Sequence, residues 1–273
     1  MRSTAKLWRM ISLLSGIATV LLICGFFYAV KDISNPSSAA GISVSPGADS
    51  GSEQPAPSAS DEIGIVAIGD SLAKGTGDDE GEGFAGRTVE LLKQENPGRE
   101  VKLYGNLGIN GLLTTGLLDE LKENGVQHML KEANVILLSI GGNDLFQGAE
   151  ALEEGGDLPT AAELNKAIDE ASVRLAAVIP AIKKLNPEAA LIYVGLYNPF
   201  SDIEQMRAIG NTGVTRWNTA AQTAVNKYSG ALMIPTYDLF AGNLERFLSS
   251  DHFHPNGDGY EQIAQRIVQS LKQ

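Results

Sequence analysis

The stretch Ile63-Gly-Ile-Val-Ala-Ile-Gly69-Asp-Ser71-Leu joins an apolar run directly to a polar turn. The run is apolar throughout and does not alternate, which is typical of a parallel strand that is covered on both faces. Gly69 allows a tight turn that a Cβ would resist, so polar residues follow the strand at once. The stretch therefore predicts a buried parallel strand with Ser71 just beyond its end.

Outward from this stretch, short β-branched runs alternate with longer amphipathic stretches, which is typical of an α/β domain. We expect strands at residues 63–68, 100–104, 134–140, 190–196 and 231–235. We expect helices at residues 84–96, 112–124, 161–185, 214–228 and 258–271, with helix ends marked by Gly125, Pro187 and Gly230. The sequence thus predicts a three-layer α/β domain with a five-stranded parallel sheet.

Near the N-terminus, residues 11–30 are uncharged and apolar, with Lys6 and Arg9 before them. Twenty helical residues span ~30 Å, the thickness of a bilayer core, so we expect an uncleaved, single-pass membrane anchor. The alternative is a cleavable signal peptide, although its apolar region usually has ~7–15 residues. The basic residues would keep the N-terminus in the cytoplasm, with the rest of the chain extracellular, or secreted if the segment is cleaved.

Residues 33–60 consist mainly of Ser, Pro, Gly and Ala, a composition that cannot offset the entropy of ordering and predicts a disordered linker. We therefore divide the chain into a basic end with the anchor or signal peptide (1–32), the linker (33–60) and one globular domain (61–273). The formal net charge of −12 argues against nucleic acid as a partner. The single cysteine, Cys24, excludes an internal disulfide and a thiolate metal site.

Ser71 is the first candidate for chemistry, because βα loops converge on ligands at the carboxyl ends of parallel strands. Its hydroxyl and its own backbone N–H would face the same cleft. A serine hydroxyl is a poor nucleophile near neutral pH unless a nearby base removes its proton. The alternative is a helix N-cap, a position that Asp and Ser favour.

The base would be one of three histidines, His128, His252 and His254. His128 has no convincing carboxylate partner in its sequence neighbourhood and is expected to be a surface or packing residue. Asp251 precedes His254 by three positions, and Pro255 keeps His254 extended, so one turn can present both side chains. The carboxylate would then orient the imidazole and stabilise the imidazolium. His252 is expected to project elsewhere, although it could compete for Asp251; the alternative for the whole segment is a capped helix start.

A third motif, Gly141-Gly-Asn143-Asp144, follows another expected strand. Acyl transfer needs hydrogen-bond donors where the oxyanion forms, and the amide of Asn143 can supply one. Asp144 would buttress the loop or cap the next element, and the alternative for the motif is an Asx-turn. A second donor could be the backbone N–H of Gly111, with Gly108 as its rival in the same loop.

Four segments, in this order, resemble the conserved blocks of the SGNH/GDSL hydrolase superfamily over residues 63–273. They are Gly69-Asp-Ser71-Leu, residues 106–111, Gly141-Gly-Asn143-Asp144 and Asp251-x-x-His254. The resemblance implies a flavodoxin-like α/β/α fold, with Ser71, Asp251 and His254 as catalytic residues. It also implies an oxyanion hole formed by Ser71, Gly111 and Asn143. The sequence departs from many relatives after Gly111, where it has two leucines instead of polar residues.

The resulting hypothesis is a serine esterase or lipase, acting on acyl-ester or lysophospholipid-type substrates. The alternatives are an O-acetylesterase of cell-wall or other polysaccharides and a non-catalytic binding module on the same fold. We expect no metal or organic cofactor. Loops at residues 147–160 and 197–211 could line the substrate. Phe146, Phe200 and Met206 are candidates for contact with an acyl chain, although each could belong to the core.

Overall fold

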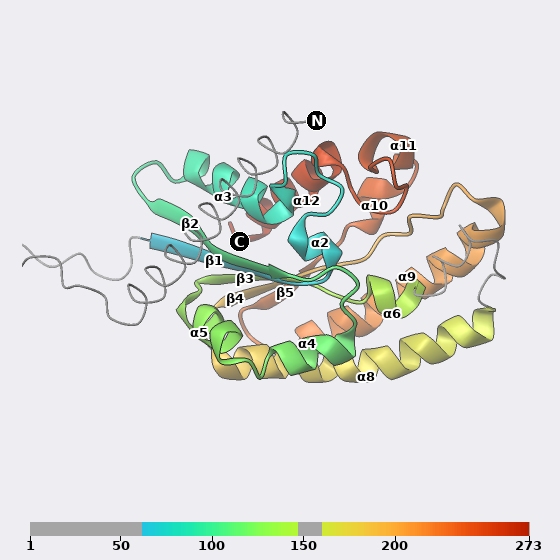
Figure 1. Cartoon of the computed structure of the whole chain (residues 1–273), viewed down its shortest axis with the longest axis horizontal. Coiled ribbons are helices and arrows are strands. Elements are labelled where there is room, and N and C mark those ends of the chain that lie inside the picture. Colours follow the sequence, from blue (N-terminus) through green and yellow to red (C-terminus); the bar gives the residue numbers. More distant parts are fainter. Residues whose placement is uncertain (1–61, 147–159, 273) are drawn as a thin grey trace, which may run out of the picture. The chain divides into compact units, whose positions relative to one another are not determined.

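The computed structural model describes residues 62–146 and 160–272, which belong to one unit of the chain, Pro55–Gln273. Five parallel strands form a single sheet in the order β2-β1-β3-β4-β5 (Figure 1). The strands are β1 (Glu62–Gly69), β2 (Glu100–Gly108), β3 (Val135–Ser139), β4 (Ala190–Val194) and β5 (Ala231–Ile234). The five expected strands are thus confirmed.

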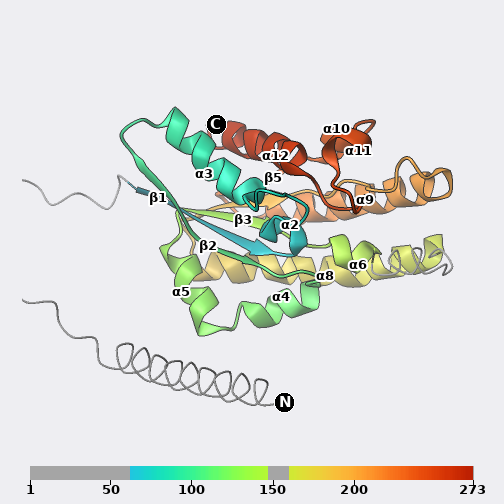
Figure 2. The same ribbon diagram turned by 45° about the horizontal axis from the view of Figure 1, so that its top comes forward.

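The described helices fall on both faces of this sheet (Figure 2). One face carries α2 (Ser71–Lys74), α3 (Gly83–Glu95), α10 (Tyr237–Phe240), α11 (Leu244–Phe247) and α12 (Gly257–Ser270). The other face carries α4 (Thr114–Glu120), α5 (Asn124–Glu132), α6 (Gly142–Phe146), α8 (Ala161–Leu185) and α9 (Glu204–Val225). This is the expected three-layer α/β/α arrangement.

Alternate residues of each central strand pack into two separate hydrophobic cores, one on each face of the sheet. In β1, Ile65 and Ala67 pack under α3 and α12, whereas Val66 and Ile68 pack on the opposite face, toward α8 and α9. All four are at most 1% exposed, which explains why the strand is apolar without alternation. Burial on both faces leaves the loops at the strand ends as the place for polar side chains.

The order of the strands reverses between β1 and β3. In an open parallel sheet, ligands bind beyond the carboxyl ends of the strands where the strand order reverses. Here β1 has β2 on one side and β3 on the other, and the chain that leaves β1 starts with Ser71. The chain that leaves β3 leads into α6, which carries Asn143.

Two helix predictions were wrong in their bounds. Residues 112–124 do not form one helix: α4 ends before Leu121, and α5 begins at Asn124, so Gly125 lies in a first turn and marks no helix end. Leu121 and Val126 are both buried but five positions apart, a spacing that one helical stripe cannot keep. The break lets each short helix turn its own apolar side to the core.

The helix expected at residues 214–228 begins ten residues earlier, at Glu204. Its first turns carry Met206, which is 2% exposed and belongs to the core, so Met206 is not a cleft residue. The second half of the loop expected at residues 197–211 is therefore helical. Further along α9, a Cβ at Gly213 would lie 2.8 Å from Leu164 of α8. A small residue is needed for the close packing of α9 on α8, and this packing overrides its weak helix propensity.

Within residues 62–146 and 160–272, no helix combines the length and the hydropathy that a bilayer span requires. The expected anchor at residues 11–30 and the linker at residues 33–60 lie outside the described residues, as does most of the loop at residues 147–160.

Candidate active site

Ser71 is the first residue of α2 and is 4% exposed. The chain reaches it through Gly69, which has φ +134°, and a Cβ at Gly69 would lie 1.7 Å from the carbonyl oxygen of Ser139. Asp70 then caps α2, because its Oδ1 accepts a hydrogen bond from Leu72 N at 3.1 Å. The end of β1 is thereby fixed against β3, and the hydroxyl of Ser71 is held at the carboxyl edge of the sheet.

The structure brings His254 and Asp251 to this hydroxyl. His254 Nε2 lies 2.8 Å from Ser71 Oγ, and His254 Nδ1 lies 2.7 Å from Asp251 Oδ2. The imidazole side chain is 17% exposed and the carboxylate 44%. One ring nitrogen therefore meets a hydroxyl and the other an acid, which is the contact pattern of a nucleophile, a base and an orienting group.

The second carboxylate oxygen of Asp251 is held by its own loop. Oδ1 accepts hydrogen bonds from Ser249 Oγ at 2.7 Å and from the backbone N–H groups of Phe253 and His254, both at 2.9 Å. Burial alone would raise the pKa of Asp251, but these hydrogen bonds and that of the His254 ring outweigh it and lower the pKa to about 2. Asp251 is thus ionised at neutral pH and suited to stabilise a positively charged imidazole.

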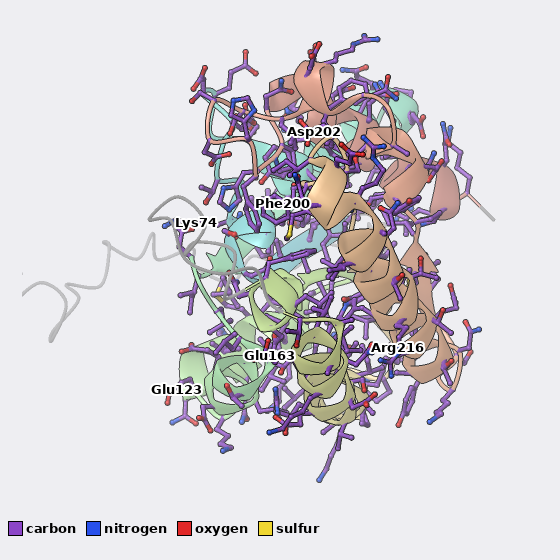
Figure 3. The ribbon with its side chains drawn as sticks, turned by 90° about the vertical axis from the view of Figure 1, so that its right-hand side faces the viewer. Lys74, Glu123, Glu163, Phe200, Asp202 and Arg216 are labelled. Carbon is purple, nitrogen blue, oxygen red and sulfur yellow. The ribbon has the colours of Figure 1, made fainter. Side chains whose placement is uncertain are left out.

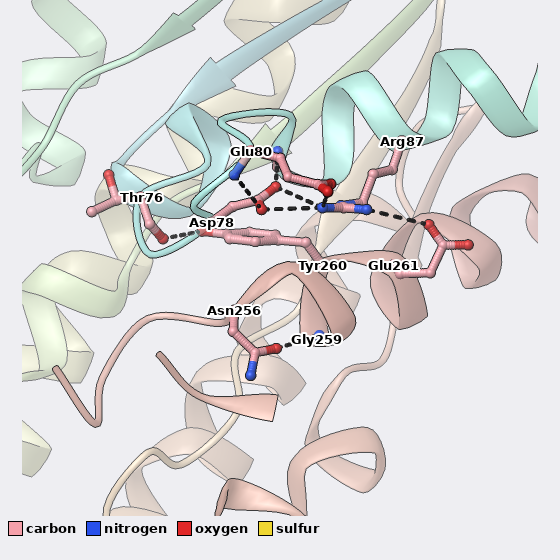
Figure 4. A network of polar contacts seen from close by, with 9 residues as sticks. Thr76, Asp78, Glu80, Arg87, Asn256, Gly259, Tyr260 and Glu261 are labelled. Carbon is pink, nitrogen blue, oxygen red and sulfur yellow. Dashed lines mark hydrogen bonds and ion pairs between the residues drawn. The ribbon is translucent and has the colours of Figure 1, made fainter. Parts of the chain in front are cut away.

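We call residues 248–256 the histidine loop. Leu248 and Pro255 form an antiparallel bridge at its base, and the Tyr197 hydroxyl donates to the Phe253 carbonyl at 2.6 Å. Asn256 closes the loop as the cap of α12, accepting from Gly259 N at 3.0 Å (Figure 4). Contacts at both ends of the loop therefore hold its backbone independently of the His254 side chain.

A polar network joins the segment after Ser71 to the helix after His254 (Figure 4). The Tyr260 hydroxyl of α12 donates to the Thr76 carbonyl at 2.8 Å. Arg87 of α3 bridges Asp78, whose side chain is 1% exposed, at 3.1 Å and Glu261 of α12 at 4.0 Å. The segment that carries Ser71 and the helix that follows His254 are thus tied together.

The two candidate glycines occupy different environments. Gly108 donates its N–H to Asn106 Oδ1 at 2.9 Å, and a Cβ there would lie 2.3 Å from Lys74 N, so this glycine serves the close packing of β2 on α2. Gly111 has φ +75° and open space around it, and no hydrogen bond within residues 62–146 and 160–272 uses its N–H. Of the two, Gly111 is the one that can offer a donor to a ligand.

Asn143 lies beside this loop and is half-buried. Its Nδ2 donates one hydrogen to the Leu112 carbonyl at 2.9 Å, which leaves the second amide hydrogen for another acceptor. On the side toward Ser71, a Cβ at Gly142 would lie 3.8 Å from Asp70 Oδ2. Ser71, Gly111 and Asn143 therefore lie on the segments that follow β1, β2 and β3, at the carboxyl edge of the sheet.

The remaining histidines are not part of this cluster. His128 is exposed on α5. His252 is exposed with φ 53°, and within the described ranges its ring forms no hydrogen bond to Asp251, whose oxygens are taken by Ser249, Phe253 and His254. In those same ranges there is no group of three or more His, Cys, Asp or Glu side chains that could hold a metal ion.

Two residues of the site had no role in the prediction from sequence. Asp70 is fully buried, and burial raises its pKa to about 7 against the hydrogen bonds from Ser139 and Leu72 that lower it. Phe253 places its ring 5.0 Å from that of His254 and packs near Phe146 and Phe200. In the sequence, the position of Phe253 between Asp251 and His254 was the one signal that could have indicated its place beside the imidazole.

A serine that contacts a histidine, whose other ring nitrogen contacts an aspartate, at the carboxyl edge of a parallel α/β sheet is the arrangement typical of serine hydrolases. A model of the GDSL-like lipase/acylhydrolase family matches residues 67–262. The chain belongs to this family and is a carboxylic ester hydrolase.

Two curated relatives cover most of the chain. YpmR of Bacillus subtilis, an uncharacterized protein, is 34% identical over 215 residues, which are 78% of this chain and 82% of that protein. The spore germination lipase LipC of Bacillus licheniformis is 29% identical over 210 residues, which are 74% of this chain and 93% of LipC.

Solved structures agree in fold. The lipase Lip_vut3 from a goat rumen metagenome superimposes with a TM-score of 0.66 and 26% identity, covering 76% of this chain and 97% of its own. The acetylxylan esterase Axe2 from Geobacillus stearothermophilus has a TM-score of 0.56 and 18% identity, covering 77% and 94%. The second likeness concerns the fold alone.

Proposed function

We propose that the chain is a serine esterase or lipase in which Ser71, His254 and Asp251 form the catalytic triad. The 2.8 Å contact between Ser71 Oγ and His254 Nε2 carries this proposal. His254 takes the hydroxyl proton as Oγ attacks the ester carbonyl, and Asp251 stabilises the imidazolium. His254 then protonates the leaving alcohol, and the water that it next activates hydrolyses the acyl-serine to the acid.

The oxyanion of the tetrahedral intermediate would be held by the N–H groups of Ser71 and Gly111 and by the second amide hydrogen of Asn143. No hydrogen bond among the described residues uses either backbone N–H, so both remain available to a ligand. Such preorganised donors stabilise the transition state more than the ester itself, because the negative charge develops only during attack.

An acyl chain is the substrate part that the surroundings of His254 favour. Phe146, Phe200 and Phe253 pack as one aromatic cluster, with ring centroids 5.4 to 6.3 Å apart, and Phe253 contacts the imidazole edge-on. Phe200 and Phe253 are only partly buried, and Figure 3 shows Phe200 at the carboxyl edge of the sheet. Apolar rings beside the reacting atoms support acyl-ester or lysophospholipid-type substrates.

The second candidate is an O-acetylesterase of polysaccharides. The fold that the chain shares with Axe2, an acetylxylan esterase, is the observation in its favour. The two candidates differ in acyl-chain length, because an acetyl group is too short to use the aromatic cluster.

The decisive experiment is hydrolysis of p-nitrophenyl esters from acetate to palmitate by the full-length chain and by Ser71→Ala. We expect Ser71-dependent turnover with an optimum beyond acetate, because longer chains bury apolar surface against the cluster. An optimum at acetate would favour the O-acetylesterase. Turnover that is equal in Ser71→Ala would remove Ser71 from the mechanism, and a folded chain without any turnover would favour a non-catalytic binding module.

Membrane attachment through residues 11–30 also stays a proposal, supported by the uncharged apolar run in the sequence. An uncleaved anchor should keep the chain in the membrane fraction after carbonate washing and release it only with detergent. Recovery of a shortened chain from the medium would indicate a cleaved signal peptide instead.

A further inference from the structure

The backbone around Gly111 is held by side chains from other parts of the chain. Residues 109–111 are exposed and lie between β2 and α4 without regular structure. Two consecutive residues of α6 hold the next stretch of backbone: Asn143 donates to the Leu112 carbonyl, and Asp144 Oδ2 accepts from Thr114 N, both at 2.9 Å. Asn143, which offers one proposed oxyanion donor, and the loop of Gly111, which offers the other, are thus held together through α6.

Asp144 needs support of its own, because its side chain is 2% exposed. Thr114 Oγ1 donates to Asp144 Oδ1 at 2.7 Å, and Thr114 is fully buried. Arg174 of α8 donates Nε to Thr114 Oγ1 at 2.8 Å and Nη2 to Asp144 Oδ1 at 3.3 Å. Within residues 62–146 and 160–272, Arg174 is the one cation that pairs with Asp144. A buried carboxylate is costly unless it is paired and hydrogen-bonded in this way.

We propose that Arg174 is a positioning residue for the oxyanion donors of this enzyme. It acts through Asp144 and Thr114 and touches no reacting atom. Without its guanidinium, Asp144 would be buried without a cation, and its hold on Thr114 N would loosen. The segment after Gly111 and the helix that carries Asn143 would then lose their fixed relation. This role rests on the proposed function, since the donors matter only if Ser71 forms a tetrahedral intermediate.

The test is Arg174→Gln in the full-length chain, with kcat and KM measured on the best p-nitrophenyl ester. We expect kcat to fall by ~10- to 100-fold while KM changes by less than about 2-fold, because misplaced donors affect the transition state and not substrate binding. Affinity for phenylboronic acid, which forms a tetrahedral adduct with serine, should fall by the same factor as kcat. Arg174→Lys keeps the charge without the planar fork and should restore part of kcat.

Arg216→Gln is the matched control. Arg216 lies on α9, is 40% exposed and pairs with Asp169 of α8 at 2.7 Å, on the opposite side of the view in Figure 3 from Lys74. It should keep the wild-type kcat. Wild-type kcat in Arg174→Gln, or a loss that only follows the folded fraction with unchanged boronate affinity, would overturn the role of Arg174 while Ser71-dependent esterase activity stands. If the wild-type chain shows no Ser71-dependent turnover on any ester, the proposed function fails, and the role of Arg174 fails with it.

Discussion

The histidine loop and the glycine loop (residues 106–113) both contribute to the candidate site but are held in different ways. In the histidine loop, the four hydrogen bonds to Asp251 come from Ser249, Phe253 and His254, all within three positions of it. In the glycine loop, Asn106 bonds to the Ala73 carbonyl, Asn110 accepts from Thr76 and Leu112 accepts from Asn143, each across more than thirty positions. The proposed base and its acid are therefore assembled locally, whereas the proposed oxyanion side depends on the tertiary fold.

This difference suggests where substitutions act. A change in the histidine loop should remove a chemical group and leave the rest of the domain in place. A change around the glycine loop should alter both geometry and stability, because its contacts also join the loops that follow β1, β2 and β3. Single substitutions in each loop can separate these two outcomes.

The largest effect is expected for His254→Ala. Removal of the base should lower kcat by roughly 10⁴- to 10⁶-fold, as for triad members in general. His252→Asn is the matched control, because Asn tolerates the positive φ of 53° at that position and the ring of His252 does not contact Asp251. Steady-state hydrolysis should show that the His254 variant is inactive and the His252 variant active. Urea unfolding curves should show that both variants keep the stability of the wild type. A strong loss in His252→Asn would mean that the second histidine takes part.

On the other side of the site, Asn143→Ala should lower kcat by roughly 10²- to 10³-fold, the usual effect of one oxyanion donor. It should also reduce the urea midpoint, because the bond to the Leu112 carbonyl is lost. His254→Ala is expected to spare stability, so the pair of variants tests the difference between the loops directly. A fall in kcat without any loss of stability would show that the Leu112 contact does not support the fold.

The sequence was sufficient for the locally assembled parts. Each strand is an apolar run that needs no distant partner to be recognised, and Asp251 and His254 share one short segment. The preference for Gly111 over Gly108 rested on the family resemblance alone, because the contact of Gly108 with Lys74 forms only in the folded chain. The role of Arg174 could not be predicted from the sequence either, since Arg174 donates to Thr114 across sixty positions and belongs to no motif.

The two glycines allow a smaller test of the same difference. Gly108→Ala should destabilise the domain by ~1–3 kcal/mol, because the added Cβ overlaps the backbone of Lys74 and forces β2 and α2 apart. Gly111→Ala should cost about 1 kcal/mol, since the space is open and only the positive φ opposes it. Urea unfolding of both variants measures the two values. If Gly111→Ala lost more stability than Gly108→Ala, Gly111 would be the packing residue and Gly108 the candidate donor.

The last effect concerns Asp70, the buried residue that precedes Ser71, and it depends on pH. Burial raises the folded-state pKa of Asp70 to about 7 from 3.8, and its Oδ2 has no hydrogen-bond partner within the described residues. Between these pH values the folded state binds more protons than the unfolded state, so Asp70 makes stability fall as pH rises. Asp70→Asn keeps an oxygen for Leu72 N and Ser139 Oγ but cannot ionise.

The variant should therefore gain stability relative to wild type as pH rises from 4 to 7, by roughly 3 kcal/mol, and the gain should level off above pH 7. Urea midpoints at several pH values measure this slope, with Asp79→Asn as an exposed control of the same kind. Asp251 acts in the opposite sense, because its lowered pKa gives stability that is lost as pH falls below 3.8. If the difference in unfolding free energy between Asp70→Asn and wild type did not change from pH 4 to 7, the pKa of Asp70 in the folded state would lie near its ordinary value. The carboxylate beside Ser71 would then be charged whenever the enzyme works.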